Sequence, residues 1–159
     1  MNSKVTTLLV LRRGDEILLA MKKRGFGAGR WNGVGGKLEP GETIEQALVR
    51  ECQEEIGVTP LRYHKIVEHD FVLDSKSPKA WHMYVHTYQC DNWKGKPIET
   101  EEMKPRWFKI SEIPYDHMWQ DDRYWMPQVL VGQKLKTVFA FDKDDNLLSQ
   151  QIQEIEEFV

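Results

Sequence analysis

The sequence has little of what marks secreted, membrane-spanning or nucleic-acid-binding chains. It contains only two cysteines, Cys52 and Cys90, which form no CxxC pair. We therefore expect neither a disulfide framework nor a zinc site. We expect the protein to be located in a reducing cytoplasm. Apolar runs are short, residues 8–11 being typical, whereas a bilayer-spanning helix needs about 20 apolar residues. No secretory signal is expected at the N-terminus. The 22 basic residues are outnumbered by 25 acidic ones, which argues against binding to a nucleic-acid polymer.

The composition instead predicts one globular domain over residues 1–159. Apolar residues make up 40% of the chain, with six Trp, six Phe and five Tyr, which is enough for a substantial core. Aliphatic, strand-like segments are separated by turn residues such as Gly14-Asp15. We expect strands at 5–12, 17–21, 62–73, 81–89 and 107–110, helices at 43–56 and 121–132, and a final hairpin over 142–146. The predicted fold class is α+β with a mixed sheet.

The helix predicted at 43–56 carries an unusual cluster of negative charge. Glu51, Glu54 and Glu55 are spaced i, i+3 and i+4, so they are neighbours on one edge and destabilise a bare helix. A solvated acidic face is the ordinary interpretation. However, residues 24–36 just before the helix hold six of the eleven glycines, and a glycine-rich turn lets a backbone carbonyl or a phosphate approach closely. Clustered carboxylates with such a carbonyl suit Mg²⁺ or Mn²⁺.

The spacing of these residues resembles a known motif. Gly36 is followed after five residues by Glu42, and after seven more by residues 50–58, Arg-Glu-Cys-Gln-Glu-Glu-Ile-Gly-Val. This pattern matches the box of the Nudix superfamily, and Cys52 is the one loose fit, at a position for a bulky apolar residue. The resemblance implies an α/β/α sandwich around a mixed sheet. It also implies metal-dependent hydrolysis of a nucleoside diphosphate linked to another group.

The resemblance also implies roles for the residues of the box. Glu51, Glu54 and Glu55 would bind the divalent metal, Mg²⁺ or else Mn²⁺, together with the carbonyl of Gly35. Arg50 would pair with a glutamate of the box such as Glu42, and the alternative is an ordinary surface ion pair. These roles suit the chemistry, because a polyphosphate repels an attacking hydroxide until metals neutralise its oxygens.

No residues for covalent catalysis stand out beside the box. The chain shows no Ser-His-Asp or Cys-His arrangement, and metal-assisted attack by water needs no protein nucleophile. We interpret the five scattered histidines as structural or surface residues: His64, His69, His82, His86 and His117.

Three further segments, at 21–33, 102–108 and 118–125, resemble the animal homologues of MutT. That family hydrolyses oxidised purine nucleoside triphosphates, such as 8-oxo-dGTP and 2-hydroxy-dATP, to the monophosphate and pyrophosphate. By this resemblance, Asn32, Asp121 and Asp122 would hydrogen-bond the edge of the base. Trp119 would stack on the base, and Phe26 and Phe71 would line the pocket. Thr7 and Lys22 would lie near the sugar and phosphates, and Glu102 would be an additional metal ligand or proton acceptor. Core packing is the alternative role for Trp119 and Trp125, and helix capping is the alternative for one aspartate.

The chain also departs from that family. Trp81 stands where the relatives have a flexible Met at the pocket wall, Leu73 replaces an aromatic residue, and the turn at 74–80 is longer. The preference among damaged purines therefore stays open. Two other functions are considered: a Nudix hydrolase of ADP-ribose, a dinucleoside polyphosphate or an undamaged nucleotide, and a non-catalytic nucleotide-binding module. The aspartate pair beside Trp119 weighs against the first and the intact glutamates weigh against the second. We expect a cytoplasmic monomer acting on a small nucleotide, with neither a nucleic-acid polymer nor a membrane as partner.

Overall fold

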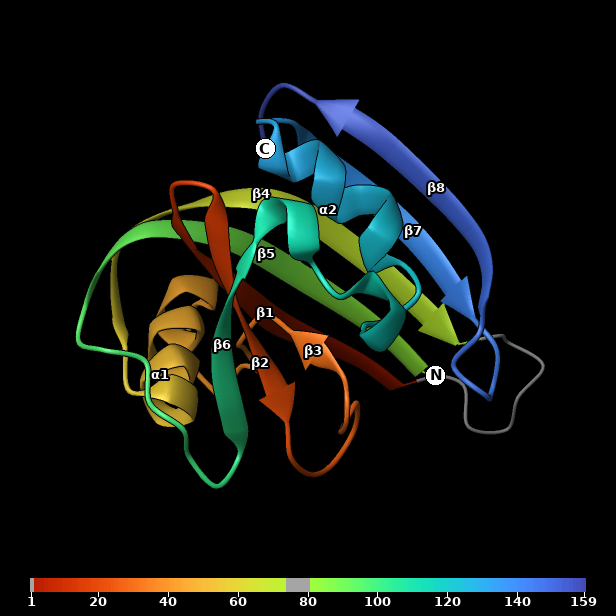
Figure 1. Cartoon of the computed structure of the whole chain (residues 1–159). Coiled ribbons are helices and arrows are strands. Elements are labelled where there is room, and N and C mark those ends of the chain that lie inside the picture. The colour runs from red at the N-terminus through yellow and green to blue at the C-terminus, as the bar shows by residue number, and fades with distance from the viewer. Residues whose placement is uncertain (1, 74–80) are drawn as a thin grey trace.

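The computed structural model describes residues 2–73 and 81–159, so the predicted turn at 74–80 lies outside the described residues. Its centre is a mixed sheet with the strand order β3-β2-β1-β5-β4-β7-β8, and β6 pairs with β2 beside this path (Figure 1). The pairs β1–β5 and β4–β7 are parallel, and the other pairs are antiparallel. The strands are β1 Asn2–Arg13, β2 Glu16–Lys22, β3 Trp31–Asn32, β4 Thr59–Leu73, β5 Trp81–Lys94, β6 Met103–Lys109, β7 Lys134–Phe141 and β8 Leu147–Ile155. The predicted α+β class with a mixed sheet is confirmed.

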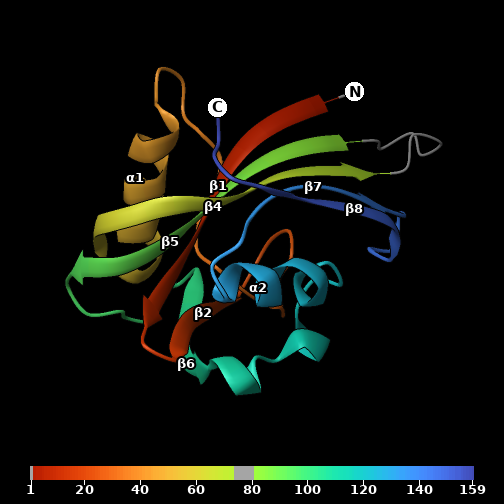
Figure 2. The same ribbon diagram turned by 90° about the horizontal axis from the view of Figure 1, so that it is seen from above.

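The sheet is covered on both faces where β1 and β2 cross it. Leu9, Val10 and Leu11 follow one another in β1 and are all buried, because side chains alternate between the faces of a strand. Leu9 and Leu11 join the core under α1, Ile44–Ile56, whereas Val10 joins the core under α2, Asp122–Leu130. The two helices thus pack in separate cores on opposite faces of the sheet (Figure 2). This is the expected α/β/α sandwich.

Most predicted elements are present, with shifted ends. The hairpin of β1 and β2 turns at Gly14, whose φ of 60° suits glycine. β6 begins earlier than the predicted strand at 107, because it pairs along the whole of β2. Two short 3₁₀ turns, Ile110–Glu112 and Tyr115–His117, then lead into α2, which holds Pro127 and ends before the predicted residue 132. The final hairpin joins β7 to β8 as predicted.

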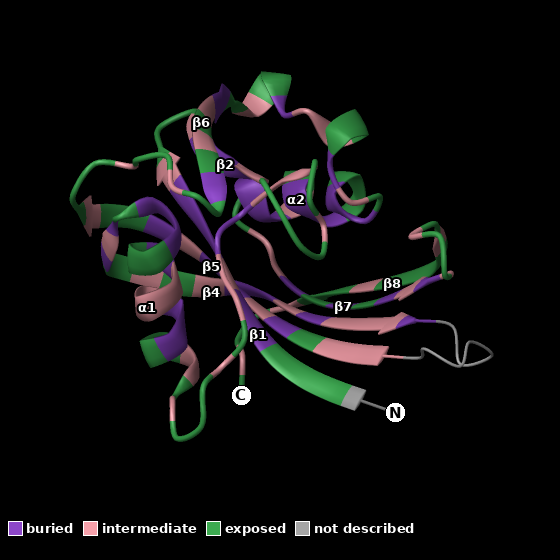
Figure 3. Cartoon of the chain, turned by 90° about the horizontal axis from the view of Figure 1, so that it is seen from below, coloured by how far each residue is buried: buried purple, intermediate pink, exposed green. Residues whose placement is uncertain are grey.

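The ends of α1 are set by local signals in the sequence. The Thr43 hydroxyl accepts from the backbone N–H of Gln46, and the Gln46 side chain accepts from the N–H of Thr43, which forms a capping box. Gly57 ends the helix in the left-handed conformation, with a φ of 72°. These caps fix which residues face the sheet. Figure 3 shows that burial concentrates where α1 and α2 meet the strands.

The two cysteines lie in the interior of the protein. Cys52 and Cys90 are free thiols buried in the core under α1, and burial raises the pKa of Cys52 to about 12. Across the described ranges, no helix is both long and apolar enough to cross a bilayer.

Candidate active site

The glycine-rich segment lies against β1 and brings its backbone close to α1. Val34 and Leu9 exchange N–H to carbonyl hydrogen bonds of 3.0 and 2.6 Å, and the Thr7 N–H donates to the carbonyl of Gly36 at 2.9 Å. A Cβ at Gly35 would overlap the backbone of Thr7, and one at Gly36 would lie 2.5 Å from the carboxyl carbon of Glu51. Glycine is therefore required at Gly35, whereas a side chain at Gly36 would force the Glu51 carboxylate to move, since the loop is held between β1 and the acidic edge of α1.

Arg50 ties this loop to the helix. Its guanidinium donates to both carboxylate oxygens of Glu42, at 2.6 and 2.9 Å, and to the carbonyl of Lys37 at 3.1 Å. It also reaches Glu51 at 3.0 Å and Glu54 at 3.1 Å. The predicted pairing of Arg50 with Glu42 is confirmed. The Arg50 hydrogen bonds hold the pKa of Glu42 at about 2, so this anchor is ionised at neutral pH.

Two of the predicted metal ligands lie side by side beneath the glycines. Glu55 is 6% exposed, and its Oε1 accepts a hydrogen bond of 3.0 Å from the Gly35 N–H. Burial, and then the charge of the neighbouring Glu51, raise the pKa of Glu55 to about 8. A cation bound between the two carboxylates would offset both the burial of the Glu55 charge and its repulsion by Glu51. Hard carboxylate oxygens next to a close backbone are a donor set that fits Mg²⁺ or Mn²⁺.

The other two predicted acidic ligands point to different partners. The Glu54 carboxylate bonds to Arg50, and its side chain is 58% exposed. Glu102, in the loop before β6, bonds to Arg24 at 2.7 Å. Among the described residues no three acidic, His or Cys side chains converge as a ready-made metal site. Binding a metal with all four glutamates would therefore require Glu102 to leave Arg24, and Glu51 and Glu54 to share their carboxylates between Arg50 and the metal.

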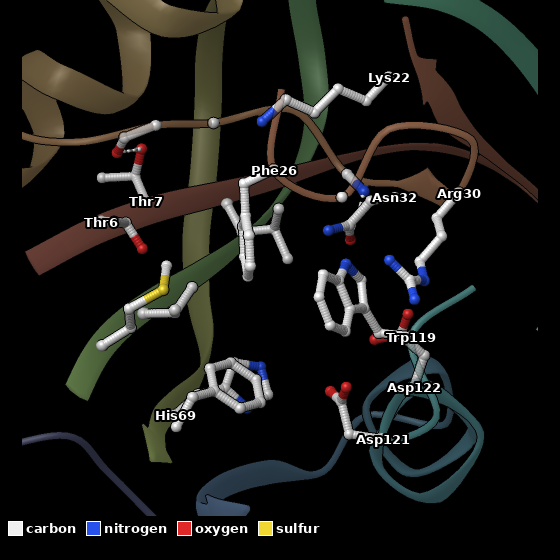
Figure 4. A pocket seen from close by; sticks show the side chains of 18 of the residues that line it. Thr6, Thr7, Lys22, Phe26, Arg30, Asn32, His69, Trp119, Asp121 and Asp122 are labelled. Carbon is white, nitrogen blue, oxygen red and sulfur yellow. Dashed lines mark hydrogen bonds between the residues drawn. The ribbon is translucent and has the colours of Figure 1, made fainter. Parts of the chain in front are cut away.

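A pocket of about 400 Å³ opens beside the two glycines, between the loop at 24–36, β4, β5 and the start of α2 (Figure 4). This volume lies in the range of small-molecule sites. The pocket contains every residue that the sequence assigned to substrate, and Gly35: Thr7, Lys22, Phe26, Asn32, Gly35, Phe71, Trp119, Asp121 and Asp122. Gly35 and Gly36 belong both to this wall and to the acidic edge. The pocket and the carboxylates are therefore two ends of one site.

Trp119 is held between two other side chains at the mouth of the pocket. The Arg30 guanidinium lies 4.1 Å from its ring centroid, and Arg30 also pairs with Asp145 at 3.3 Å. The Phe26 ring contacts Trp119 with centroids 5.1 Å apart, and Phe26 is 53% exposed. A base that stacks on Trp119 must therefore displace one of these neighbours. Phe26 is the more exposed of the two.

Asp121 and Asp122 lie at the bottom of the pocket, and both are buried from solvent. Asp121 Oδ2 accepts a hydrogen bond of 2.8 Å from the Trp125 indole N–H, whereas Asp122 Oδ2 is buried without a partner among the described residues. Burial raises the pKa of Asp121 to about 6, and burial and the Asp121 charge raise that of Asp122 well above its usual value. Asp121 occupies the N-cap position of α2, but its side chain makes no capping hydrogen bond. Trp125 is both a core residue and the support of Asp121.

Two residues line the pocket although the sequence did not assign them to it, and one residue expected at the pocket wall lies elsewhere. His69 was interpreted as structural or surface; it is buried, and it also lines the pocket, two residues before Phe71 on the same face of β4. Met83 lines the pocket beside Trp81 in the same way. Leu73, expected at the pocket wall, is buried outside the lining. Strand alternation could have found His69 and Met83 once the inward face of each strand was known.

Residues 2–129 match the family model of the NUDIX domain. The chain belongs to the Nudix family. This Nudix chain is 42% identical over 157 residues to the oxidized purine nucleoside triphosphate hydrolase of Danio rerio, an alignment that covers 98% of this chain and 97% of that protein. It is 42% identical over 158 residues to the protein of the same name in Mus musculus, covering 98% of both. The crystal structure of a MutT protein from Bacillus halodurans superposes with a TM-score of 0.79 at 26% identity, over 94% of this chain and 97% of that one.

Proposed function

We propose that this Nudix protein hydrolyses oxidised purine nucleoside triphosphates, such as 8-oxo-dGTP and 2-hydroxy-dATP, to the monophosphate and pyrophosphate. Such a reaction would remove damaged precursors from the nucleotide pool. The identity of 42% to two proteins named for this activity extends over almost the whole chain, and it supports the proposal. The aligned region spans the pocket as well as the box.

One observation carries the proposal: the shared wall at Gly35 and Gly36. A pocket for the base lies on one side of these glycines, and the carboxylates of Glu51 and Glu55 lie on the other. A nucleotide with its base against Trp119 would therefore extend its phosphates toward the acidic edge. Lys22 and Lys37 line the pocket on this path, where they would offset the charge of the phosphates.

A divalent metal, with Mg²⁺ as the proposed ion and Mn²⁺ as the alternative, would be held by Glu51, Glu54 and Glu55, with the Gly35 carbonyl and Glu102 as further ligands. When bound, it supplies neutralisation of the phosphate oxygens and a lowered pKa of the attacking water. Arg50 positions the glutamates through its bonds to Glu42 and Lys37.

The base would be read by polar groups that are already oriented. Asn32 Oδ1 accepts from the Gly33 N–H at 2.8 Å, which leaves the Asn32 amide NH₂ to donate into the pocket. Asp122 offers its unpartnered oxygen, and Asp121 is fixed by Trp125. Thr7 would contact the sugar, and Phe26 and Phe71 would enclose the base. We further propose that the protein acts as a monomer in a reducing cytoplasm, a location that the free thiols suit.

The test is a panel of substrates assayed with Mg²⁺ and resolved by ion-exchange chromatography. It includes 8-oxo-dGTP, 2-hydroxy-dATP, dGTP, dATP, ADP-ribose and a dinucleoside polyphosphate. We expect the largest kcat/KM for an oxidised triphosphate, with monophosphate and pyrophosphate as products and no turnover in EDTA. Preference for ADP-ribose or the dinucleoside polyphosphate would contradict the proposal and favour a different Nudix substrate class.

A further inference from the structure

His69 is held rigidly in the pocket wall with one nitrogen unused. The side chain lies on β4, is 2% exposed, and stacks on Phe71 with centroids 4.9 Å apart. The Trp125 ring packs against it edge to face, with ring centroids 4.6 Å apart. Its Nδ1 is 2.8 Å from the Thr137 hydroxyl on β7, whereas Nε2 is buried and makes no hydrogen bond among the described residues. Figure 4 shows the imidazole among the pocket side chains, together with Asp121 and Asp122.

The hydrogen bond to Thr137 favours the tautomer whose one unpaired donor, Nε2–H, a ligand in the pocket can pair. Within the described part of the chain, His69 is the sole side-chain hydrogen-bond partner of the Thr137 hydroxyl, which is itself buried. If Nδ1 carried the proton, the hydroxyl would accept it and its own hydrogen would be left without an acceptor, which is costly in a buried site. If the hydroxyl donates to Nδ1, both groups are satisfied. The proton of the neutral ring then lies on Nε2, so this atom is a donor.

The environment also keeps the ring neutral. Full burial lowers the pKa of His69 to about 3, so the imidazole carries one proton at neutral pH. The acidic groups that line the same pocket, Asp121 and Asp122, are themselves buried, with raised pKa values. An uncharged N–H donor is thus built into the wall between the aromatic rings of Phe71 and Trp125. A buried donor with no partner costs free energy unless a ligand pairs with it.

We propose that His69 is a specificity-determining residue, whose Nε2–H donates a hydrogen bond to an acceptor atom of the bound purine base. This inference rests on the proposed function, because it takes the pocket as the base site. The acceptor would be a carbonyl oxygen or a ring nitrogen of the purine, since these are the groups that accept an N–H. With Asn32 as a second donor, and the Asp121–Asp122 pair able to accept through its free oxygens and to donate where it is protonated, the pocket would match a base that presents both acceptors and N–H groups.

Three substitutions separate the two nitrogens of the ring. In His69→Gln the side-chain amide reaches the position of Nε2 and keeps a donor toward the pocket. In His69→Asn the shorter amide reaches only the position of Nδ1 and keeps the partner of Thr137. His69→Leu removes both, and the double variant His69→Leu/Thr137→Val also removes the hydroxyl that would be left unpaired, which protects the fold.

The experiment measures binding and turnover separately. Calorimetry without metal gives the Kd for the product nucleotide 8-oxo-dGMP, and assays with Mg²⁺ give kcat and KM for the substrates 8-oxo-dGTP and 2-hydroxy-dATP. For the Asn variant, the Leu variant and the double variant, we expect Kd and KM to rise about tenfold for at least one oxidised purine, with kcat within about threefold. His69→Gln should recover most of the loss. A nitrogen-15 NMR spectrum of the imidazole should show the Nε2–H tautomer, with its proton resonance shifted when 8-oxo-dGMP binds.

The inference is overturned if the double variant, folded by circular dichroism, keeps the Kd and KM of the parent for both oxidised purines. It is also overturned if the Asn and Gln variants bind equally, because a donor at the Nε2 position would then make no contribution. A parent protein that binds 8-oxo-dGMP but shows no change in the variants contradicts the role of His69 alone. A parent that binds no purine nucleotide contradicts the proposed function itself, and the inference with it.

Discussion

The acidic edge of α1 and the aspartate pair at the start of α2 are both made of carboxylates, but their surroundings give them opposite properties. Beside this edge, just before α1, Arg50 holds Glu42 ionised with a pKa of about 2. In the pocket no cation of the described residues contacts Asp121, and burial raises its pKa to about 6. One end of the site therefore holds a fully ionised carboxylate, whereas burial at the other end favours the protonated forms of the aspartate pair. This division suits a ligand with charged phosphates at one end and a neutral base at the other.

Glu55 is the exception at the acidic edge. It belongs to the acidic edge, but its carboxylate is buried and its pKa is raised to about 8. The Gly35 N–H is its one hydrogen-bond donor among the described residues. Without a cation the residue favours its protonated form at neutral pH, so a metal that binds it must compete with a proton. The contrast between the charged edge and the neutral pocket can be tested at each end of the site.

The largest effect is expected from Glu55→Gln. Loss of a charged ligand should lower kcat by two orders of magnitude or more, about 3 kcal/mol of barrier, because a neutral amide neutralises none of the metal charge. The variant should be at least as stable as the parent, since Gln can still accept from the Gly35 N–H and the repulsion from Glu51 is removed. Kinetics with Mg²⁺ and a thermal melt measure both. Glu45→Gln, in the first turn of α1, is the matched control. A Glu55→Gln variant with a rate near that of the parent would contradict the metal role.

At the other end of the site, Trp119→Ala should weaken base binding without affecting the acidic edge. Stacking of a base on an aromatic ring contributes about 1–3 kcal/mol, so KM for an oxidised triphosphate should rise between about fivefold and a hundredfold. The control is inorganic tripolyphosphate, which has no base to stack. Its inhibition constant should not change. If tripolyphosphate binding weakened to the same extent, Trp119 would be acting on the phosphates and the division of the site would be wrong.

The same two regions differ in how far the sequence predicts them. The acidic edge depends on local spacing: Thr43 and Gly57 set the ends of α1, and the fixed intervals from Gly36 to Arg50 identify the motif. Short-range backbone geometry determines all of this, so it can be read from one segment. The orientation of Glu102 could not be predicted, because its partner Arg24 lies 78 residues away in a different loop.

The pocket depends on long-range pairing. His69 lines it because β4 packs between β5 and β7, which brings Thr137 beside its ring. Neither the face of β4 that turns inward nor the identity of its neighbour can be read from the residues around His69. Phe71, on the same face, was predicted only through the resemblance to a family. The desolvation of Asp121 likewise follows from tertiary packing.

A smaller effect tests the charge state of the pocket. The pKa of Asp121 is raised from 3.8 in the unfolded chain to about 6, so its folded form prefers the proton. Its contribution to stability is present in full below about pH 4 and is lost as the pH rises through 6. Asp121→Asn keeps an acceptor for Trp125 and does not titrate. Relative to this variant, the parent should therefore lose on the order of 1–2 kcal/mol of unfolding free energy between about pH 4.5 and about pH 7.5.

Urea unfolding at the two pH values measures this difference. Asp116→Asn, on an exposed 3₁₀ turn, is the control and should run parallel to the parent. Because Asp121 and Asp122 interact, the observed midpoint belongs to the pair. If the parent and Asp121→Asn lost stability in parallel, the pocket carboxylates would already be ionised, and the contrast with Glu42 would disappear.

The smallest effect concerns the loop that carries Phe26. Gly27 and Gly29 have φ values of 83° and 85°, which strain any other residue, so alanine at either position should lower stability by about 1 kcal/mol. They differ in their surroundings: a Cβ at Gly27 would lie 3.4 Å from the Trp119 ring, whereas a Cβ at Gly29 would meet nothing within 4 Å. Gly29→Ala therefore reports the backbone strain alone. We expect only Gly27→Ala to raise KM as well, by about twofold or roughly 0.4 kcal/mol, because its methyl group restricts the movement by which Trp119 and Phe26 admit a base. Equal KM values for the two variants would show that the loop acts on the pocket through its backbone and not through contact with Trp119.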